Sequence, residues 1–206
     1  MMKLKICGIT NKEDLNYLIA LNVDAVGFIF VEDSPRFVTP EVVEELTYML
    51  PPFINTVGVF ANQSVDKINQ ISEKCNLSYV QLHGSESSSD CLKINRPVIK
   101  AFHVEGPDDL VEIDKYQGTV TSILLDTKSK DKLGGTGETF DWGLAVKAKT
   151  FEIPMILSGG INKDNIQKAI RVVNPYALDI SSGVESSPGK KDYNKIKEIV
   201  EIIKAT

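Results

Sequence analysis

The sequence is poor in the features that mark several specialised classes of protein. It contains only three cysteines, Cys7, Cys75 and Cys91, and their spacing fits neither a disulfide framework nor a zinc site. No stretch approaches the roughly 18 apolar residues of a membrane span. The opening residues lack the pattern of a signal peptide. We therefore expect a cytoplasmic protein in a reducing compartment, with no membrane partner and no bound metal.

Long basic runs are also missing. The chain has 23 Lys and Arg against 28 Asp and Glu, a formal net charge of -5. A nucleic-acid-binding surface normally needs a basic patch, so we expect no nucleic-acid partner. The acidic balance still permits an anionic small-molecule substrate, because a few local donors can hold a phosphate.

What the sequence does contain is a repeated alternation of short apolar runs and helical patterns. Such alternation predicts βα units and a parallel sheet. No linker or low-complexity tract divides the 206 residues, so we expect one domain over residues 1–206. The expected strands are Leu4–Cys7, Ala25–Phe30, Asn55–Phe60, Tyr79–Leu82, Val98–Phe102, Ser122–Asp126, Pro154–Ser158 and Ala177–Ser181.

Helix starts are recognisable between several of these strands. Thr39 followed by Pro40 predicts an N-cap with proline in the first turn. Ser64 and Asn162 are further candidate N-caps, and Ile196, Ile199, Val200 and Ile203 form an apolar stripe on a last helix. Weaker helical patterns cover residues 86–94, residues 108–116 and the segment after Trp142.

Two topologies fit such a pattern, a closed (β/α)₈ TIM barrel and an open doubly wound α/β sheet. The open sheet would normally bind its ligand at a G-x-G-x-x-G turn after the first strand, but that turn reads Cys7-Gly8-Ile9-Thr10. The Gly-rich turns instead follow the last two strands, where barrels commonly bind phosphate. The sequence therefore favours the barrel.

These two turns are the candidate phosphate site. Gly159 and Gly160 follow the seventh expected strand, and Ser181, Ser182 and Gly183 follow the eighth. Glycines let backbone N–H groups approach an anion, and serines add donors. Either turn alone could simply be a tight turn, but the pair at this position predicts phosphate binding.

Cys7 and Asp126 are the candidate catalytic residues, because each ends an expected strand at the rim where barrel enzymes react. Cys7 could instead be a buried small hydrophobe. We expect Lys5 to point outward, which leaves no visible group to activate the thiol. Asp126 follows Leu125 at the mouth of a buried strand. Such a carboxyl could serve as a general acid or simply cap the following loop.

Further rim residues are candidates for substrate binding. Pro35 stiffens the approach to Arg36, whose fork could bind a carboxylate, although a single Arg is more often a surface residue. His83 follows the fourth strand and could line the pocket or simply bond to the backbone, and Asp179 lies in the segment that ends the eighth. Gly134 and Gly135 lie in a Gly-rich loop that could cover the substrate or be a simple turn.

Together these segments resemble the phosphoribosylanthranilate isomerase family, and the resemblance spans the whole chain. The matching motifs, in order, are Lys5-Ile6-Cys7-Gly8-Ile9-Thr10, Gly27-Phe28-Ile29-Phe30 with Ser34-Pro35-Arg36, Gln81-Leu82-His83-Gly84, Leu125-Asp126, Gly134-Gly135-Thr136-Gly137 with Phe140-Asp141-Trp142, Ser158-Gly159-Gly160-Ile161, and Asp179-Ile180-Ser181-Ser182-Gly183-Val184-Glu185. Each motif is weakly specific alone, whereas the ordered set is strongly specific. Ser158 departs mildly from the alanine that family members often have.

The resemblance implies an Amadori rearrangement of N-(5′-phosphoribosyl)anthranilate in L-tryptophan biosynthesis. Asp126 would be the general acid, Cys7 the general base, and Arg36 would lie near the anthranilate carboxylate. Only protons move, so the resemblance implies an enzyme without a cofactor. The oligomeric state, monomer or homodimer, stays open.

Two other functions are open to a barrel with such a rim. The related histidine-pathway phosphoribosyl aminoimidazole isomerase would call for a carboxylate in place of Cys7 and a second phosphate site, and neither is visible in the sequence. A non-catalytic phosphate-binding barrel would not require the pair of Cys7 and Asp126.

Overall fold

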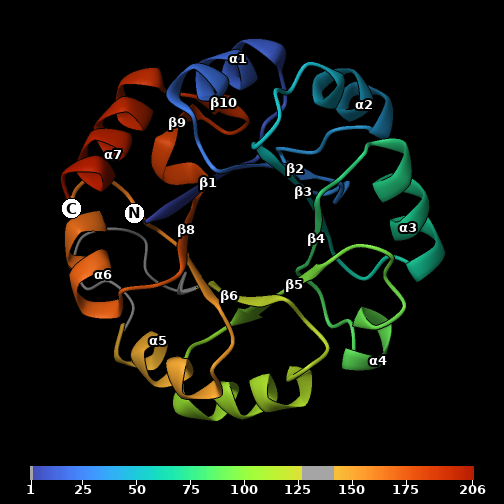
Figure 1. Cartoon of the computed structure of the whole chain (residues 1–206), viewed down its shortest axis with the longest axis vertical. Helices are drawn as coiled ribbons and strands as arrows, with labels where there is room; N and C mark the ends of the chain where they lie inside the picture. Colours follow the sequence, from blue (N-terminus) through green and yellow to red (C-terminus); the bar gives the residue numbers. More distant parts are fainter. Residues whose placement is uncertain (1, 127–141) are drawn as a thin grey trace.

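Eight parallel strands close into a barrel in the computed structural model, which describes residues 2–126 and 142–206 (Figure 1). The barrel closes where β1 pairs with β8, with Leu4 opposite Leu178 and Lys5 opposite Asp179. The strands are β1 (Lys3–Cys7), β2 (Ala25–Ile29), β3 (Asn55–Phe60), β4 (Tyr79–Leu82), β5 (Val98–His103), β6 (Ser122–Asp126), β7 (Met155–Ser158) and β8 (Ala177–Ile180). The expected barrel is confirmed, and each expected strand is present to within one residue at either end.

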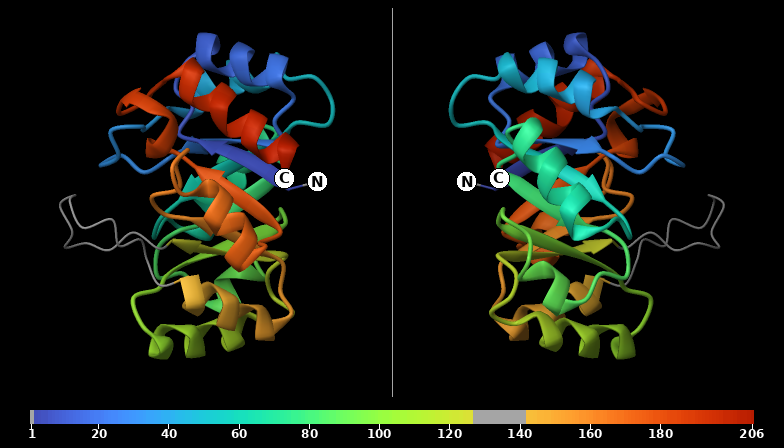
Figure 2. Two further views of the ribbon diagram at one scale, coloured as in Figure 1. Left: turned by 90° about the vertical axis from the view of Figure 1, so that its left-hand side faces the viewer. Right: turned by 90° about the vertical axis from the view of Figure 1, so that its right-hand side faces the viewer.

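Helices surround the barrel as an outer ring (Figures 1 and 2). The α-helices are α1 (Lys12–Leu21), α2 (Pro40–Tyr48), α3 (Val65–Lys74), α4 (Ser88–Cys91), α5 (Trp142–Ala148), α6 (Ile166–Val173) and α7 (Tyr193–Ala205). Three 3₁₀ helices are η1 (Pro107–Tyr116), η2 (Lys149–Phe151) and η3 (Ser182–Val184). None of the helices in the described part of the chain is long and apolar enough to cross a membrane.

The strands are apolar on both faces because each face is covered. Side chains alternate along a strand, so one set packs inside the barrel and the other packs under the helices. The inner set includes Val57, Ile99, Leu124 and Ile156, which form a cluster separate from the larger core outside the barrel. A polar residue at an inward-facing position of a strand therefore places a polar side chain inside the barrel.

The helix starts follow the expected N-caps in two cases and differ in a third. Helix α2 follows Thr39 with Pro40 in its first turn, and the Ser64 side chain accepts a hydrogen bond from the Lys67 backbone at the start of α3. The prediction that Asn162 caps the next-to-last helix is wrong, since the N-cap of α6 is Asn165. Asn162 is held in a preceding turn, where its side chain accepts a hydrogen bond from the Asp164 N–H.

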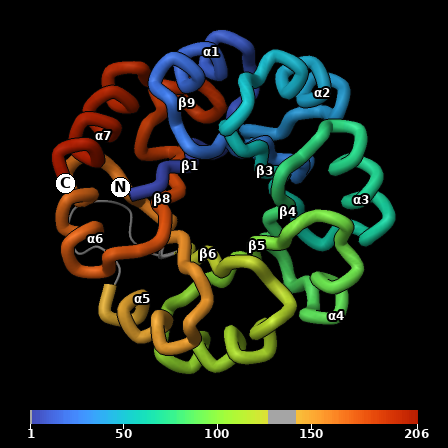
Figure 3. The backbone as a smooth tube through the Cα atoms, viewed as in Figure 1, coloured from blue at the N-terminus to red at the C-terminus, as the bar shows by residue number. Residues whose placement is uncertain are grey.

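Several elements have no counterpart among the ranges expected from the sequence. Among them are α1 and a hairpin of β9 (Glu185–Ser187) and β10 (Lys190–Lys191) between β8 and α7. Figure 2 shows this orange-red hairpin at the end of the barrel toward which β1 runs, where the carboxyl ends of the strands lie. The two chain termini lie close together on one side of the ring (Figure 3). The hairpin thus adds side chains to the rim that is expected to hold the site.

Candidate active site

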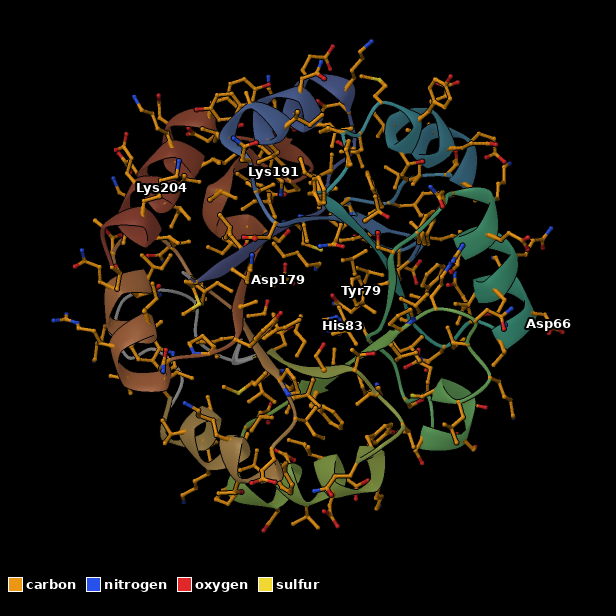
Figure 4. The ribbon with its side chains drawn as sticks, viewed as in Figure 1. Asp66, Tyr79, His83, Asp179, Lys191 and Lys204 are labelled. Atoms are coloured by element: carbon orange, nitrogen blue, oxygen red, sulfur yellow. The ribbon has the colours of Figure 1, made fainter. Side chains whose placement is uncertain are left out.

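One cavity of about 260 Å³ opens at the carboxyl ends of the strands. Every candidate site residue that the structure describes lines it: Cys7, Arg36, His83, Asp126, Gly159, Gly160, Asp179, Ser181, Ser182 and Gly183. Figure 4 shows His83 and Asp179 toward the middle of the ring, whereas Asp66 and Lys204 lie on its outer rim. The candidates Gly134 and Gly135 lie outside the described residues.

Cys7 reaches this cavity from the end of β1 and is only 5% exposed. Its neighbour across the sheet is Gly27, with which it pairs in the β1–β2 register. A Cβ atom at Gly27 would lie 2.7 Å from the Cys7 Sγ and 3.2 Å from the Lys5 Cε. A side chain at position 27 would therefore displace both the thiol and the lysine, so the glycine makes room for the pair.

The expectation that Lys5 points outward is wrong. Lys5 and Cys7 are two residues apart on one strand, so both side chains lie on the inner face of the barrel. The Lys5 Nζ is 2.9 Å from the Asp179 Oδ2 and 3.0 Å from the Gln81 Oε1, and Lys5 is 3% exposed. Its charge also lowers the pKa of the Cys7 thiol. A buried cation is thus present beside the candidate base.

The pKa of Cys7 reflects competing effects of its surroundings. Burial is the largest influence and raises the pKa, and the Asp179 carboxylate raises it further. The ammonium groups of Lys5 and Lys191 lower it, but the net pKa stays above that of an ordinary thiol. The resting side chain is therefore a thiol at neutral pH, held beside two cations that favour the thiolate.

Lys191 lies at the centre of a second buried network, which joins the β9–β10 hairpin to β1. Its side chain is 0% exposed, and its Nζ donates to the Cys7 backbone carbonyl at 2.6 Å. The same Nζ lies 2.9 Å from the Glu185 Oε1. Burial lowers the pKa of Lys191, while Glu185 opposes that effect. The hairpin therefore contacts the main chain of the candidate base directly.

Glu185 also holds the guanidinium of Arg36. The Arg36 Nε donates to the Glu185 Oε1 at 2.8 Å, and the Nη2 donates to the Oε2 at 2.6 Å. These bonds occupy two of the five N–H donors of the guanidinium. Since Arg36 lines the cavity, its remaining donors can meet a ligand with a fixed orientation.

Asp126 ends β6 on the other side of the cavity, with 27% of its side chain exposed. The His83 Nε2 lies 3.5 Å from the Asp126 Oδ2. On the far side of the imidazole, the His83 Nδ1 is 3.0 Å from the Gln81 Nε2. The candidate acid therefore has an oriented imidazole next to it.

The two Gly-rich turns lie against each other at the rim. A Cβ at Gly183 would collide with the Ile161 carbonyl oxygen, so only glycine allows this approach. Gly159 and Gly160 both have positive φ, at 85° and 67°, which side chains other than glycine rarely allow. The turns therefore present backbone and hydroxyl groups side by side, as a phosphate-binding site requires.

Two polar atoms that line this region are buried without a hydrogen-bond partner among the described residues. They are the Asp179 Oδ1 and the Ser181 Oγ. Buried polar atoms are normally satisfied, and an exception at a cavity wall is typical of a ligand contact. Across residues 2–126 and 142–206, no group of three or more His, Cys, Asp or Glu side chains is placed to hold a metal ion.

Four residues of the site were not assigned a role from the sequence: Lys5, Gln81, Glu185 and Lys191. Period-two alternation could have found the first two, because Lys5 must share a face with Cys7, and Gln81 with His83. Glu185 and Lys191 give no such signal, since the hairpin that carries them was not predicted. Their partners lie 149 and 184 residues away in sequence.

The chain matches known proteins along nearly its whole length. A model of the family described as N-(5'phosphoribosyl)anthranilate (PRA) isomerase matches residues 4–202. The N-(5'-phosphoribosyl)anthranilate isomerase of Geobacter metallireducens is 46% identical over 205 residues, covering 100% of both chains. That of Pelobacter propionicus is 47% identical and covers 100% of this chain and 97% of its own.

Solved structures give the same match. The phosphoribosyl anthranilate isomerase from Thermotoga maritima superposes with a TM-score of 0.93 at 42% identity, covering 100% of both chains. A phosphoribosyl anthranilate isomerase in complex with reduced 1-(o-carboxyphenylamino)-1-deoxyribulose 5-phosphate gives a TM-score of 0.90 at 40% identity, again covering 100% of both chains.

Proposed function

The chain belongs to the N-(5'-phosphoribosyl)anthranilate isomerase family, and from this premise we propose how its own residues carry out the reaction. It is an isomerase of L-tryptophan biosynthesis that converts N-(5'-phosphoribosyl)anthranilate to 1-(2-carboxyphenylamino)-1-deoxyribulose 5-phosphate. The observation that supports the catalytic assignment is that Cys7, Asp126 and both Gly-rich turns line one cavity. This membership selects one of the three functions considered from the sequence.

Asp126 acts as the general acid in the proposed first step. Its carboxyl group gives a proton to the ribose ring oxygen, the bond from C1 to that oxygen breaks, and the anthranilate nitrogen forms a Schiff base with C1. The developing Asp126 carboxylate is next to the His83 imidazole. A position at the cavity mouth lets the carboxyl group recover a proton from solvent after turnover.

Cys7 acts as the general base in the second step. Its thiolate removes the proton from C2, and the resulting enolamine tautomerises to the ketone. Asp126 loses one proton and Cys7 gains one, so the isomerisation has no net proton change. The thiolate is supported by the charges of Lys5 and Lys191. These cations partly offset the cost of ionising a buried thiol.

The remaining site residues hold the two ends of the substrate. Gly159, Gly160, Ser181, Ser182 and Gly183 bind the phosphate through backbone N–H groups and serine hydroxyls. At the other end, the Arg36 guanidinium binds the anthranilate carboxylate with the donors that Glu185 does not occupy.

The ribose lies between these ends. The unpaired Asp179 Oδ1 accepts a hydrogen bond from a ribose hydroxyl, and His83 lines the same region. Gly134 and Gly135 stay candidates for substrate binding from the sequence. The sugar is thereby held with Cys7 and Asp126 on opposite sides of it.

We propose that the enzyme acts in the cytoplasm on this small molecule alone, without nucleic acid. All three cysteines are free and buried, which suits a reducing compartment. The Thermotoga maritima relative is described as a dimeric phosphoribosylanthranilate isomerase, from which monomers were generated. For this chain, both a monomer and a homodimer are compatible with a site built from one chain.

A fluorescence assay of freshly made N-(5'-phosphoribosyl)anthranilate tests the substrate-binding assignment. Loss of the fluorescence of the N-linked anthranilate gives turnover, and Arg36→Ala should weaken binding of a product analogue that carries the carboxylate by about tenfold or more. Binding of ribose 5-phosphate, which lacks the anthranilate, should change far less. Equal losses for the two ligands would contradict the carboxylate contact, and no turnover by the unaltered protein would overturn the function.

A further inference from the structure

A line of polar side chains crosses the barrel interior from the base to the acid. The Lys5 Nζ is 3.0 Å from the Gln81 Oε1, the Gln81 Nε2 is 3.0 Å from the His83 Nδ1, and the His83 Nε2 is 3.5 Å from the Asp126 Oδ2. Lys5 and Gln81 are 3% and 1% exposed. These two side chains are therefore shielded from water.

We propose that Gln81 is a positioning residue that holds His83 in the tautomer with its proton on Nε2, and thereby selects the oxygen of Asp126 that carries the catalytic proton. The inference adds a residue to the proposed reaction and rests on the assignment of Asp126 as its acid. Gln81 lines the cavity, but its role follows from its two hydrogen bonds.

The first step of the argument is the orientation of the Gln81 carboxamide. A lysine ammonium only donates hydrogen bonds, so the Gln81 oxygen must face Lys5. Lys5 is itself held in place by the Asp179 carboxylate at 2.9 Å. The buried ion pair therefore fixes which end of the amide points toward the imidazole.

The second step is the tautomer of His83. With its oxygen turned to Lys5, the Gln81 amide presents its NH₂ group to the His83 Nδ1 at 3.0 Å. A hydrogen bond there requires Nδ1 to accept, so the neutral ring carries its proton on Nε2. That nitrogen is the one that faces Asp126. The ring therefore donates toward the carboxyl group.

The third step concerns the acid. An N–H directed at the Asp126 Oδ2 makes that oxygen an acceptor, so in the neutral acid the proton is carried by Oδ1. After this proton has passed to the ribose oxygen, the same N–H stabilises the new carboxylate. In the opposite tautomer, the lone pair of Nε2 would face Oδ2 and bind the acidic proton there. Gln81 thus keeps the proton available to the substrate.

Nitrogen-15 NMR of the ligand-free protein tests the tautomer directly. The chain has only two histidines, so the imidazole signals can be assigned with a His83→Gln variant. The spectra are recorded at a pH of about 8.5, well above the pKa of an imidazole in a model peptide. We expect the unprotonated signal of His83 at Nδ1 and the protonated one at Nε2. The reverse pattern in the unaltered protein would overturn the inference.

Two variants test the role of Gln81 in setting the tautomer. Gln81→Glu keeps the shape but offers only acceptors, so the His83 proton should move to Nδ1. Gln81→Met removes both hydrogen bonds and should leave a mixture of tautomers. His103, whose Nε2 faces the Glu105 Oε1 at 2.8 Å, is the internal control and should not change. An unchanged His83 pattern in both variants would contradict the proposal.

Single-turnover kinetics connect the tautomer to the reaction. We expect Gln81→Met to slow the chemical step by about tenfold or more while substrate binding changes little, because the phosphate and carboxylate contacts remain. The exposed Gln117→Met is the matched control. If the tautomer shifts but the chemical step does not slow, the catalytic part of the proposal is wrong. If the unaltered protein shows no turnover, the proposed function fails while the tautomer result stands.

Discussion

The two side chains that we propose as acid and base occupy different surroundings. Cys7 is 5% exposed and lies beside buried charges of both signs, whereas Asp126 has 27% of its side chain exposed at the cavity mouth. After turnover, the base must release the proton that it took from the substrate. The acid must be reprotonated. Burial near cations suits the first task, and access to solvent suits the second.

Changing Asp126 to Asn should separate catalysis from binding. The amide keeps the shape but cannot transfer a proton, so turnover should fall by about 10²-fold or more. Binding of a phosphate-bearing product analogue should stay within a few-fold of the unaltered protein, because the Gly-rich turns are not touched. Calorimetric binding and the fluorescence assay measure the two quantities. Undiminished turnover in Asp126→Asn would remove Asp126 from its role.

The pH dependence of Cys7 alkylation should report the state of its thiol. Burial raises the pKa of Cys7 above that of an ordinary thiol, so at neutral pH only a small fraction of the free enzyme carries the thiolate. Iodoacetamide reacts with the thiolate, so the rate of Cys7 alkylation should still be rising between pH about 7 and about 9. Cys7→Ser should remove this alkylation and lower turnover severely. An alkylation rate that is already constant over this range would contradict a raised pKa for the Cys7 thiol.

At the scale of elements, the β9–β10 hairpin completes the site that the barrel strands begin. Lys191 and Glu185 connect the hairpin to the Cys7 carbonyl and to Arg36. A hairpin of this length would not be stable alone, and its place is determined by buried ion pairs and by the Thr10 hydroxyl, which donates to the Gly189 carbonyl. The segment after β8 therefore contributes buried contacts to the candidate site.

Lys191→Met should affect both stability and reactivity. The Glu185 carboxylate would keep its ion pair with Arg36 but lose the one with Lys191. The free energy of unfolding should therefore fall by about 3 kcal/mol. Loss of a cation near Cys7 should also raise the pKa of the thiol and move the rise of Cys7 alkylation to higher pH. Urea unfolding and the pH profile measure these effects.

Lys190→Met is the matched control, because Lys190 is the exposed neighbour on the same strand. It should alter neither the unfolding midpoint nor the pH profile appreciably. A Lys191→Met protein with the same profile as Lys190→Met would show that the lysine only holds the hairpin in place.

At the scale of the whole molecule, stability should depend on alkaline pH through cysteines far from the cavity. Cys75 lies between the barrel and its helices, and Cys91 ends α4. Burial raises the pKa of each thiol to about 11. In the unfolded chain both thiols titrate near about 8.5, so the unfolded state loses its protons first. Stability is therefore complete below that pH and falls as pH rises toward about 11.

The slope of this decline is the quantity to measure. Unfolding midpoints in urea between pH about 8 and about 11 should fall less steeply in Cys91→Ala than in the unaltered protein. The absolute stability of the variant is lower at every pH because of the cavity it creates, and only the difference in slope matters. Parallel curves for the two proteins would contradict a raised pKa for the Cys91 thiol.

The sequence by itself determined the barrel and the position of the principal candidate residues at its rim. Apolar runs separated by helical patterns indicate a parallel sheet covered on both faces, and short-range order is enough to place Cys7, Asp126 and the two Gly-rich turns at strand ends. These signals are local, because a strand end or a tight turn is encoded within a few residues. The same local signal can also mislead. Asn162 and Asn165 are both suitable N-caps within one turn, and the helix begins after Asn165, three residues later than predicted.

Only the tertiary structure decided which charges meet. Lys5 has Asp179 as its partner because the barrel closes between β1 and β8, and Arg36 has Glu185 because the hairpin returns to the rim. Such pairs join residues more than a hundred positions apart, and nothing in either local segment specifies the other. The free energy of burying a charge depends on the partner that folding supplies, so the electrical environment of Cys7 exists only once the barrel is closed.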